Sequence, residues 1–508
     1  FVVATYHPGM LLATWPLVRA TGERSLEAGR SMAGAAAVAG ALVLALVAGL
    51  AARSLPLGLA VGAVWMLSRD TLSWFPFFRV DFLALLLGWL ALAVLGAFEA
   101  MSQRGAGRSM GQGPWEIGLR GIGEALAVVF GVAAFFTKQT MVGPLAAIGI
   151  AMLWHSPRRG IVWCALVALI TGGLMGALEY TSPGSYWFQA ITANANVFSL
   201  VQLQVWAVHF WRFQPVLTSG ALLLAPLAIG VMIARARRGD DSLSSSTVSA
   251  RPLLFGTALV IYALFGLASF LGAGKLGAAE NYMLEPNAAL LLLLAWSQGA
   301  FATWLASRTA KKQCAQDDSQ EEKFARHRYA VLGIFLMAVP GLVLLSHAET
   351  MFSPPWFVPA EQRPEVASVT LGLKSPTVDD YRAAARASKW VEFAPDATYS
   401  ERALFMLMQG RQPILHPFIM AQLAREGKWN EDELFDRWAE HPLTQVIVTE
   451  DLRPQATLNG DAQFTPRFKE SLNAGFTLQE IAPGRLFTYY RWIARDVAPG
   501  SLAASAAP

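Results

Sequence analysis

Apolar residues fill long continuous runs through the first two thirds of the chain, and polar residues interrupt these runs only briefly. An apolar run of about 20 residues predicts a membrane-crossing helix, because that length spans the hydrocarbon core of a bilayer. By this criterion we expect about ten spans, at 33–52, 55–73, 82–98, 121–136, 141–154, 160–178, 219–234, 252–272, 286–306 and 329–346. The shortest of them need flanking residues or a locally thinner bilayer to complete a crossing.

The pattern changes after about residue 350. Apolar positions at helical spacing predict a helix over 378–393. Residues 434–438 are expected to lie in a charged helix that opens at Asn430, a suitable N-cap. The short apolar or aromatic runs 446–448 and 487–490 predict strands. The fold class we expect is therefore mainly α, a polytopic transmembrane helix bundle followed by a C-terminal extracytoplasmic α/β domain.

The same pattern divides the chain into four parts. Residues 1–32 are expected to form an outer loop or interfacial segment, 33–346 the bundle, 347–497 the soluble domain and 498–508 a disordered tail. Residues 179–218, rich in aromatic and amide side chains, are expected to form a long outer loop. The chain opens on Phe1, and we expect its natural N-terminus to lie upstream.

Composition excludes an ordinary soluble protein. The chain is 54% hydrophobic and 15% charged, whereas soluble domains carry roughly 25% charged residues. Residues 1–346 contain 24 Lys+Arg against 16 Asp+Glu, and the remainder contains 16 against 20. An excess of positive charge suits loops that face anionic lipid. The two cysteines, Cys164 and Cys314, do not suggest a disulfide framework.

The basic residues predict an orientation. When the loops are numbered alternately from the predicted spans, sixteen Lys and Arg fall on one side of the membrane and eight on the other. The richer side is expected to be cytoplasmic. Lys138, Lys275 and the C-terminal domain then lie on the outer face.

Three outer segments each place a cation beside a hydrogen-bonding partner at the end of a span. They are Arg79 with Asp81, Lys138 with Gln139, and Lys275 followed by Glu280, Asn281 and Glu285. A single charged side chain at such a position can cap a helix or can extend to the lipid headgroups. Together they predict a pocket for a phosphate attached to a lipid, with cations neutralising the phosphate and apolar walls accepting the chain.

These segments carry a resemblance. Arg79-x-Asp81-x-Leu83, Phe135-Phe136-x-Lys138-Gln139-Thr140 and Asn281-Tyr282-x-Leu284-Glu285-Pro286, with the opening Tyr6-His7-Pro8-Gly9-Met10, resemble bacterial integral-membrane glycosyltransferases of the GT-C type. Protein O-mannosyltransferases and aminoarabinose transferases are relatives of these enzymes. The resemblance covers most of residues 1–346.

The resemblance implies transfer of a sugar from a polyprenyl-phosphate donor to an acceptor hydroxyl of a protein, lipid or glycan, at the outer face of the bacterial inner membrane. Other expected partners are membrane lipids, and no nucleic acid is expected. Such enzymes take the acceptor proton with an acidic residue of the first outer loop. No acidic residue precedes Glu23, so this base is expected upstream of Phe1, with Asp81 or Asp70 as substitutes.

The expected roles follow from these positions. Lys138, Arg79 and Lys275 are expected to bind the donor phosphate, and the substrate-binding set is Asp81, Gln139, Glu280, Asn281, Glu285 and His7. Carboxylates such as Asp81 and Glu285 could also hold Mg²⁺ or Mn²⁺.

Two other functions fit a polytopic chain with charges near its span ends. A secondary transporter usually shows internal repeats and helices interrupted at the midplane, neither of which the sequence shows. A protein that binds lipid-linked sugars without chemistry would need the same pocket.

Overall fold

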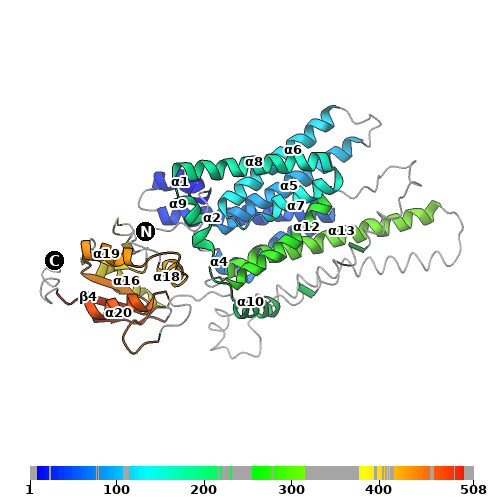
Figure 1. Cartoon of the computed structure of the whole chain (residues 1–508). Helices are drawn as coiled ribbons and strands as arrows, with labels where there is room; N and C mark the ends of the chain where they lie inside the picture. Colours follow the sequence, from blue (N-terminus) through cyan, green and yellow to red (C-terminus); the bar gives the residue numbers. More distant parts are fainter. Residues whose placement is uncertain are drawn as a thin grey trace, which may run out of the picture. The chain divides into compact units, whose positions relative to one another are not determined.

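A computed structural model provides the structure of the chain (Figure 1). It describes residues 9–21, 25–75, 77, 79–106, 114–213, 218–219, 226, 229–230, 254–275, 278, 280–314, 377–393, 397–402, 405–406, 409, 411, 417–457, 463–485 and 487–496. The chain divides into two compact units. One is a helical bundle, and the other contains residues 184–198 together with the described residues from 377 onward.

The bundle is built from apolar helices, which lie side by side in Figure 1. Its helices are α1 (Gly9–Thr21), α2 (Ser25–Ala52), α3 (Leu55–Leu67), α4 (Arg69–Trp74), α5 (Asp81–Ala106), α6 (Pro114–Thr137), α7 (Gly143–His155), α8 (Pro157–Thr181), α10 (Leu200–Phe213), α12 (Leu254–Ser269) and α13 (Leu284–Cys314). Two short 3-10 helices, η4 (Phe270–Gly274) and η5 (Glu280–Met283), lie between α12 and α13.

The bundle has the helices of a membrane protein. Among the described residues, four helical segments are long and apolar enough to cross a membrane, namely Glu27–Ala52, Asp81–Met101, Pro157–Thr181 and Leu254–Gly274. Leu55–Leu67, Gly121–Thr137 and Gly143–His155 are shorter apolar helices. Helices therefore occupy eight of the ten predicted spans. The predicted span 329–346 lies outside the described residues, and 219–234 lies almost entirely outside them.

Two sequence-based expectations for residues 1–346 were wrong in detail. The predicted span 55–73 is two helices, because the chain is extended at Ser68, whose side chain accepts a hydrogen bond from the amide of Thr71 and caps α4. The region 179–218 is not a single long loop. It contains α9 (Ser185–Ala190), η2 (Thr192–Asn194) and α10.

Close helix packing in the bundle depends on small residues. Gly58 and Gly62 of α3 face α2, and a Cβ atom at these positions would lie 2.3 Å from the carbonyl oxygen of Ala45 and 2.5 Å from that of Ala41. The spacing of the two glycines is that of a small-xxx-small helix contact, which lets two backbones approach each other in a membrane. The α2–α3 contact therefore tolerates no side chain on that face of α3.

Buried indole groups connect helices that are distant in sequence. Trp65 of α3 donates to the carbonyl oxygen of Leu284 at the start of α13 (3.1 Å), and Trp89 of α5 donates to the hydroxyl of Tyr262 in α12 (2.9 Å). A buried indole N–H needs such a partner, because an unpaired polar group is costly away from water. The bond to Leu284 positions the start of α13, where the candidate site lies, and the bond of Trp89 joins α5 to α12.

The second unit is an α/β fold with a four-stranded sheet in the order β1-β2-β4-β3. The strands are β1 (Thr398–Ser400), β2 (Gln445–Val448), β3 (Phe476–Ala482) and β4 (Tyr489–Ala494). Strands β1 and β2 are parallel, whereas β4 is antiparallel to both β2 and β3. The described helices that follow in this part of the chain are α16 (Val378–Phe393), α18 (Pro417–Arg425), α19 (Asp432–Glu440) and α20 (Pro466–Gly475).

Both faces of this sheet are covered. Val446 and Val448 of β2 belong to the core cluster that includes Leu423 of α18, Leu434 of α19 and Leu472 of α20. Alternate residues of a strand point to opposite faces, and Ile447 accordingly belongs to the core beneath α16. The predicted helix 378–393 and the strand 446–448 are confirmed. The predicted strand 487–490 begins two residues later in the structure, at Tyr489.

Candidate functional site

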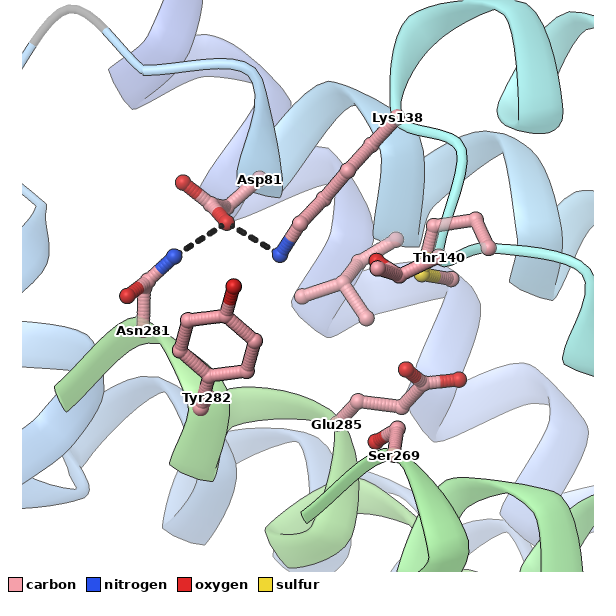
Figure 2. Close-up of a pocket in the computed structure, with 9 residues that line it drawn as sticks. Asp81, Lys138, Thr140, Ser269, Asn281, Tyr282 and Glu285 are labelled. Carbon is pink, nitrogen blue, oxygen red and sulfur yellow. Dashed lines mark hydrogen bonds and ion pairs between the residues drawn. The ribbon is translucent and has the colours of Figure 1, made fainter. Parts of the chain in front are cut away.

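The side chain of Asp81 is the centre of a buried polar cluster in the bundle. Asp81 is the first residue of α5, and it is 1% exposed. Its Oδ1 atom accepts hydrogen bonds from Lys138 Nζ (2.6 Å) and Asn281 Nδ2 (3.0 Å), and its Oδ2 atom accepts one from Trp74 Nε1 (3.1 Å). A buried carboxylate needs such compensation. Figure 2 shows Asn281 and Lys138 approaching the same oxygen from two sides.

Lys138 enters the cluster from the turn that joins α6 to α7. The apolar helix α6 ends at Thr137, and the backbone amide of Lys138 donates to the carbonyl oxygen of Ala134 (2.9 Å). Its ammonium group forms an ion pair with Asp81 and lies 5.3 Å from the centre of the Tyr282 ring. Lys138 is therefore a buried cation, held by a carboxylate and an aromatic face.

A small cavity adjoins this ion pair, and we refer to it as the Asp81 cavity. Its volume is about 20 Å³, which is room for roughly one water molecule. It is lined by Asp81, Leu85, Lys138, Thr140, Met141, Ser269, Asn281, Tyr282 and Glu285. The lining combines a cation, two carboxyl groups, an amide and hydroxyl groups with apolar side chains.

Glu285 is the second carboxyl group of the Asp81 cavity. It lies in the first turn of α13 and is 7% exposed. Figure 2 shows its side chain beside Ser269, at the end of the cavity away from Asn281. Ser269 is the last residue of α12 and donates to the carbonyl oxygen of Gly266 (2.7 Å). The starts of α5 and α13, the end of α12 and the α6–α7 turn therefore all meet here.

Arg79 approaches Asp81 from outside the cavity. Its Nε atom lies 3.6 Å from Asp81 Oδ2, and its guanidinium carbon lies 5.0 Å from the centre of the Trp74 ring. The Arg79 side chain is 37% exposed. Arg79 is not among the residues that line the cavity, so it supports the cluster from the surface.

Lys275 follows η4 and is also absent from the cavity lining. Its backbone carbonyl accepts a hydrogen bond from Gln202 of α10 (2.8 Å), and Gly274 accepts one from the amide of Ser199 (2.7 Å). Burial lowers the pKa of Lys275, and the positive charge of Lys138 lowers it further. The two lysines are thus close enough to repel each other.

The other predicted site residues have different surroundings. Asp70 of α4 is buried and accepts a hydrogen bond from Asn287 of α13 (2.8 Å), away from the cavity lining. Gln139 is half-buried in the α6–α7 turn and does not line the cavity. The side chain of Glu280, and the whole of His7, lie outside the described residues.

Several residues of the site were not among the candidates from the sequence. Trp74 and Tyr282 contact the ion pair, and Thr140, Met141 and Ser269 line the cavity. Tyr282 and Thr140 lie inside the motifs that carry the resemblance, so the motifs contained the signal for them. Ser269 has no such signal, because its position at the cavity depends on how α12 packs.

The cluster does not fit a divalent cation. Among the described residues, no group of three or more His, Cys, Asp or Glu side chains is placed to hold a metal ion. Both oxygens of Asp81 already accept hydrogen bonds, one of them from an ammonium group. A metal at Asp81 would have to displace Lys138. Binding of Mg²⁺ or Mn²⁺ stays a prediction.

Three cations surround the Asp81 carboxylate. Lys138 lines the cavity, Arg79 lies 3.6 Å from Asp81 Oδ2 outside the lining, and the charge of Lys138 acts on Lys275. The lining itself holds one cation and two carboxyl groups. Attraction of an anionic group therefore depends on all three cations together and is strengthened where the local dielectric is low.

Comparison with known proteins finds a similarity in fold to a solved structure. No protein-family model matches the sequence, and no curated protein matches it. Among solved structures, the chain is similar to one described as "Crystal Structure of ArnT from Cupriavidus metallidurans bound to Undecaprenyl phosphate". The similarity covers 100% of this chain and 90% of that chain, with 12% sequence identity and a TM-score of 0.45. Similarity of this degree assigns no family.

Proposed function

We propose that this chain is a membrane glycosyltransferase that moves a sugar from a polyprenyl-phosphate donor to an acceptor hydroxyl at the outer face of a membrane. The observation that carries the proposal is the convergence of three distant motifs on the Asp81 cavity. Asp81, Lys138 and Asn281 are joined by two hydrogen bonds to one carboxylate oxygen, although they are separated by 57 and 200 residues. These motifs also carry the resemblance to GT-C enzymes.

Lys138 is the proposed contact for the donor phosphate. An ammonium group has three N–H donors, so Lys138 can donate to Asp81 and to a phosphate oxygen at the same time. During transfer, the acceptor oxygen bonds to the anomeric carbon, the bond from that carbon to the phosphate oxygen breaks, and its electron pair leaves with the polyprenyl phosphate. The proton of the acceptor hydroxyl is taken up by the phosphate monoester that is released. A cation stabilises the charge that develops on the leaving phosphate.

Asp81 acts as a positioning residue in this proposal. A carboxylate that accepts hydrogen bonds from Lys138, Asn281 and Trp74 is a poor proton acceptor, because those donors stabilise its charged form. Its role is to hold the ammonium group of Lys138 and the amide of Asn281 in place. The amide of Asn281 and the carboxyl group of Glu285 are the proposed contacts for the sugar.

The site must open to accept a donor. A cavity of about 20 Å³ is too small for a phosphate group, so side chains of the lining must move when the donor binds. The ring of Tyr282 separates Asn281 from Glu285 along the same helical segment (Figure 2). We propose that displacement of this ring accompanies donor binding.

The proposal is tested by binding of polyprenyl phosphate to the purified chain in nanodiscs. Lys138→Ala is expected to weaken binding at least about tenfold, which is about 1.4 kcal/mol. Thermal unfolding first establishes that each variant is folded at the assay temperature, and the control for loss of an unrelated ion pair is Arg159→Ala. Arg159 also forms an ion pair, with Glu124 of α6. At a rise of 1.5 Å per residue, Glu124 lies about 20 Å from Lys138 along that helix.

Equal binding by the wild type and Lys138→Ala would remove Lys138 from the site and would refute the proposal. A loss of the same size in Arg159→Ala would show that the effect is not specific to the Asp81 cavity. Turnover is tested separately by following consumption of a labelled polyprenyl-phosphate sugar in membranes. Binding without consumption would favour a non-catalytic binding protein.

A further inference from the structure

A second cavity lies between α7 and α8, and we refer to it as the α7–α8 groove. Its volume is about 320 Å³, within the range of sites that hold small molecules. It is lined by Phe135, Val142, Leu145, Ala146, Gly149, Ile150, Leu153, Trp163, Cys164, Val167, Ala168 and Thr171. Nearly all of these side chains are apolar, and no charged residue is among them.

The groove exists because α8 contacts the bundle along a short part of its length. Among the described residues of α8, only Gly160 and Trp163 are buried. The two helices are in close contact beside Trp163. A Cβ atom added to Gly149 of α7 would lie 3.0 Å from the sulfur of Cys164 in α8. Away from this contact, small residues of both helices, such as Ala146 and Ala168, leave the space open.

The groove begins at the turn that carries Lys138. Met141 lines the Asp81 cavity, and its neighbour Val142 lines the groove. Phe135, three residues before Lys138, lines the groove as well. From Gly143 to Leu153 the groove follows α7 for about 15 Å at 1.5 Å per residue. Neighbouring residues of one five-residue turn thus line the polar cavity and the long apolar groove.

We propose that the α7–α8 groove holds the first isoprene units of the donor's chain while Lys138 holds its phosphate. This inference rests on the proposed function. A polyprenyl phosphate has an anionic head directly attached to one long chain of apolar, methyl-bearing isoprene units. The order of the two cavities matches that order of head and chain. A phospholipid does not, because two acyl chains and a glycerol group follow its phosphate.

The groove can be filled without altering the Asp81 cavity. Ala168→Phe places a ring in the groove, near Val142 and Thr171. Leu169→Phe is the matched control, because Leu169 is the next residue of α8, is 73% exposed and does not line the groove. Binding of polyprenyl phosphate and of methyl phosphate, which has no chain, is then compared in nanodiscs for both variants and for Lys138→Ala.

Ala168→Phe is expected to weaken binding of polyprenyl phosphate about tenfold, since the ring excludes the chain, and to leave methyl phosphate binding within about twofold. Leu169→Phe is expected to change neither. If Ala168→Phe leaves both affinities unchanged while Lys138→Ala lowers both, the groove inference is wrong and the proposed function stands. If Lys138→Ala lowers neither, the proposed function itself fails.

A second measurement identifies the occupant directly. A polyprenyl phosphate with a photoreactive diazirine on an isoprene unit near the phosphate is expected to label peptides of α7 and α8. Excess unlabelled polyprenyl phosphate should prevent the labelling, whereas phosphatidylglycerol should not. Equal competition by phosphatidylglycerol would show that bulk lipid fills the groove, and labelling confined to other helices would also overturn the inference.

Discussion

Asp81 is the residue on which most of the site's hydrogen bonds converge. Its two oxygens accept from an ammonium group, an amide and an indole that come from three separate parts of the chain. A buried ion pair contributes little net stability when it is intact, yet removing one partner leaves an uncompensated charge. The effect of the pair on stability is therefore measured by removing one partner.

Asp81→Ala is expected to destabilise the bundle by about 3–5 kcal/mol, because it leaves Lys138 buried without its partner. Lys138→Ala is expected to cost a similar amount. The double variant should be more stable than the sum of the two losses predicts, since it leaves neither charge alone. Thermal unfolding of the four proteins in detergent measures this. If the stability loss of the double variant equals the sum of the two single losses, Asp81 and Lys138 do not interact energetically.

At the residue scale, the sequence indicated which side chains matter but not how they pair. Lys138, Asp81 and Asn281 were candidates because each is polar at the end of an apolar run. That Lys138 and Asn281 share one oxygen of Asp81 depends on the packing of α5, α6 and α13. A single sequence does not contain that information. Lys275 and Arg79 were expected in the same pocket, and the structure places both near it but outside its lining.

At the scale of elements, the contact between α2 and α3 depends on the absence of side chains. A Cβ atom at Gly58 or Gly62 would meet backbone atoms of α2 at 2.3 and 2.5 Å. Backbone atoms cannot move aside as the end of a flexible side chain can. A substitution here must therefore separate the two helices.

Gly58→Ala and Gly62→Ala are each expected to lower the thermal stability of the bundle. Gly173→Ala in α8 is the matched control, because a Cβ atom there meets nothing within 4 Å among the described residues. That change should be neutral or stabilising by up to about 1 kcal/mol, since alanine favours a helix more than glycine does. Melting temperatures in one detergent provide the comparison. Equal melting temperatures in all three variants would refute the close contact.

Most helices of the bundle could be predicted from apolar runs, and the errors have local causes. The helix break at Ser68 comes from a cap inside an apolar run, Ser68-Arg69-Asp70-Thr71, which a search for length and apolarity passes over. The helix α10 was missed because its aromatic and amide residues suggested a loop. In the second unit, α16 was predicted from its periodicity alone, whereas β1 and β3 were not predicted, β1 being only three residues long.

At the scale of the whole molecule, the two units differ in how they are stabilised. The bundle uses apolar contacts and a small number of buried polar bonds. The second unit contains an extended polar network beneath α16. Arg491 donates to Gln445 (3.0 Å) and Glu480 (2.8 Å), and Arg386 donates to the other oxygen of Glu480 (2.8 Å). Glu480 thus joins α16 to strands β3 and β4.

This network makes the stability of the second unit depend on pH. Partial burial raises the pKa of Glu480, but hydrogen bonds from Arg386 and Arg491 outweigh that effect and hold the pKa below the ordinary value of 4.5. A carboxyl group with a lowered pKa in the folded state stabilises the fold above its unfolded pKa. That contribution is lost as the pH falls through the folded pKa.

Glu480→Gln is therefore expected to destabilise the second unit at pH 7, and the difference from the wild type should shrink as the pH falls below about 4.5. Calorimetry of the full chain in detergent, over a series of pH values, measures the transition of this unit. A difference that stays constant from pH 7 to pH 3 would contradict the assignment. Arg382→Gln is a control, because the ion pair of Arg382 with Asp379 is largely exposed.

The turn from Lys138 to Val142 has a consequence for altering the enzyme that we propose. It is five residues long, it supplies Lys138 and Met141 to one cavity, and it supplies Val142 to the other. An insertion or deletion in this turn would move Lys138 and Val142 together. The contacts for the donor's phosphate and for its isoprene chain would then both change. A variant with a different preference in chain length is therefore better sought by changes on α8, which borders the groove and leaves the turn as it is.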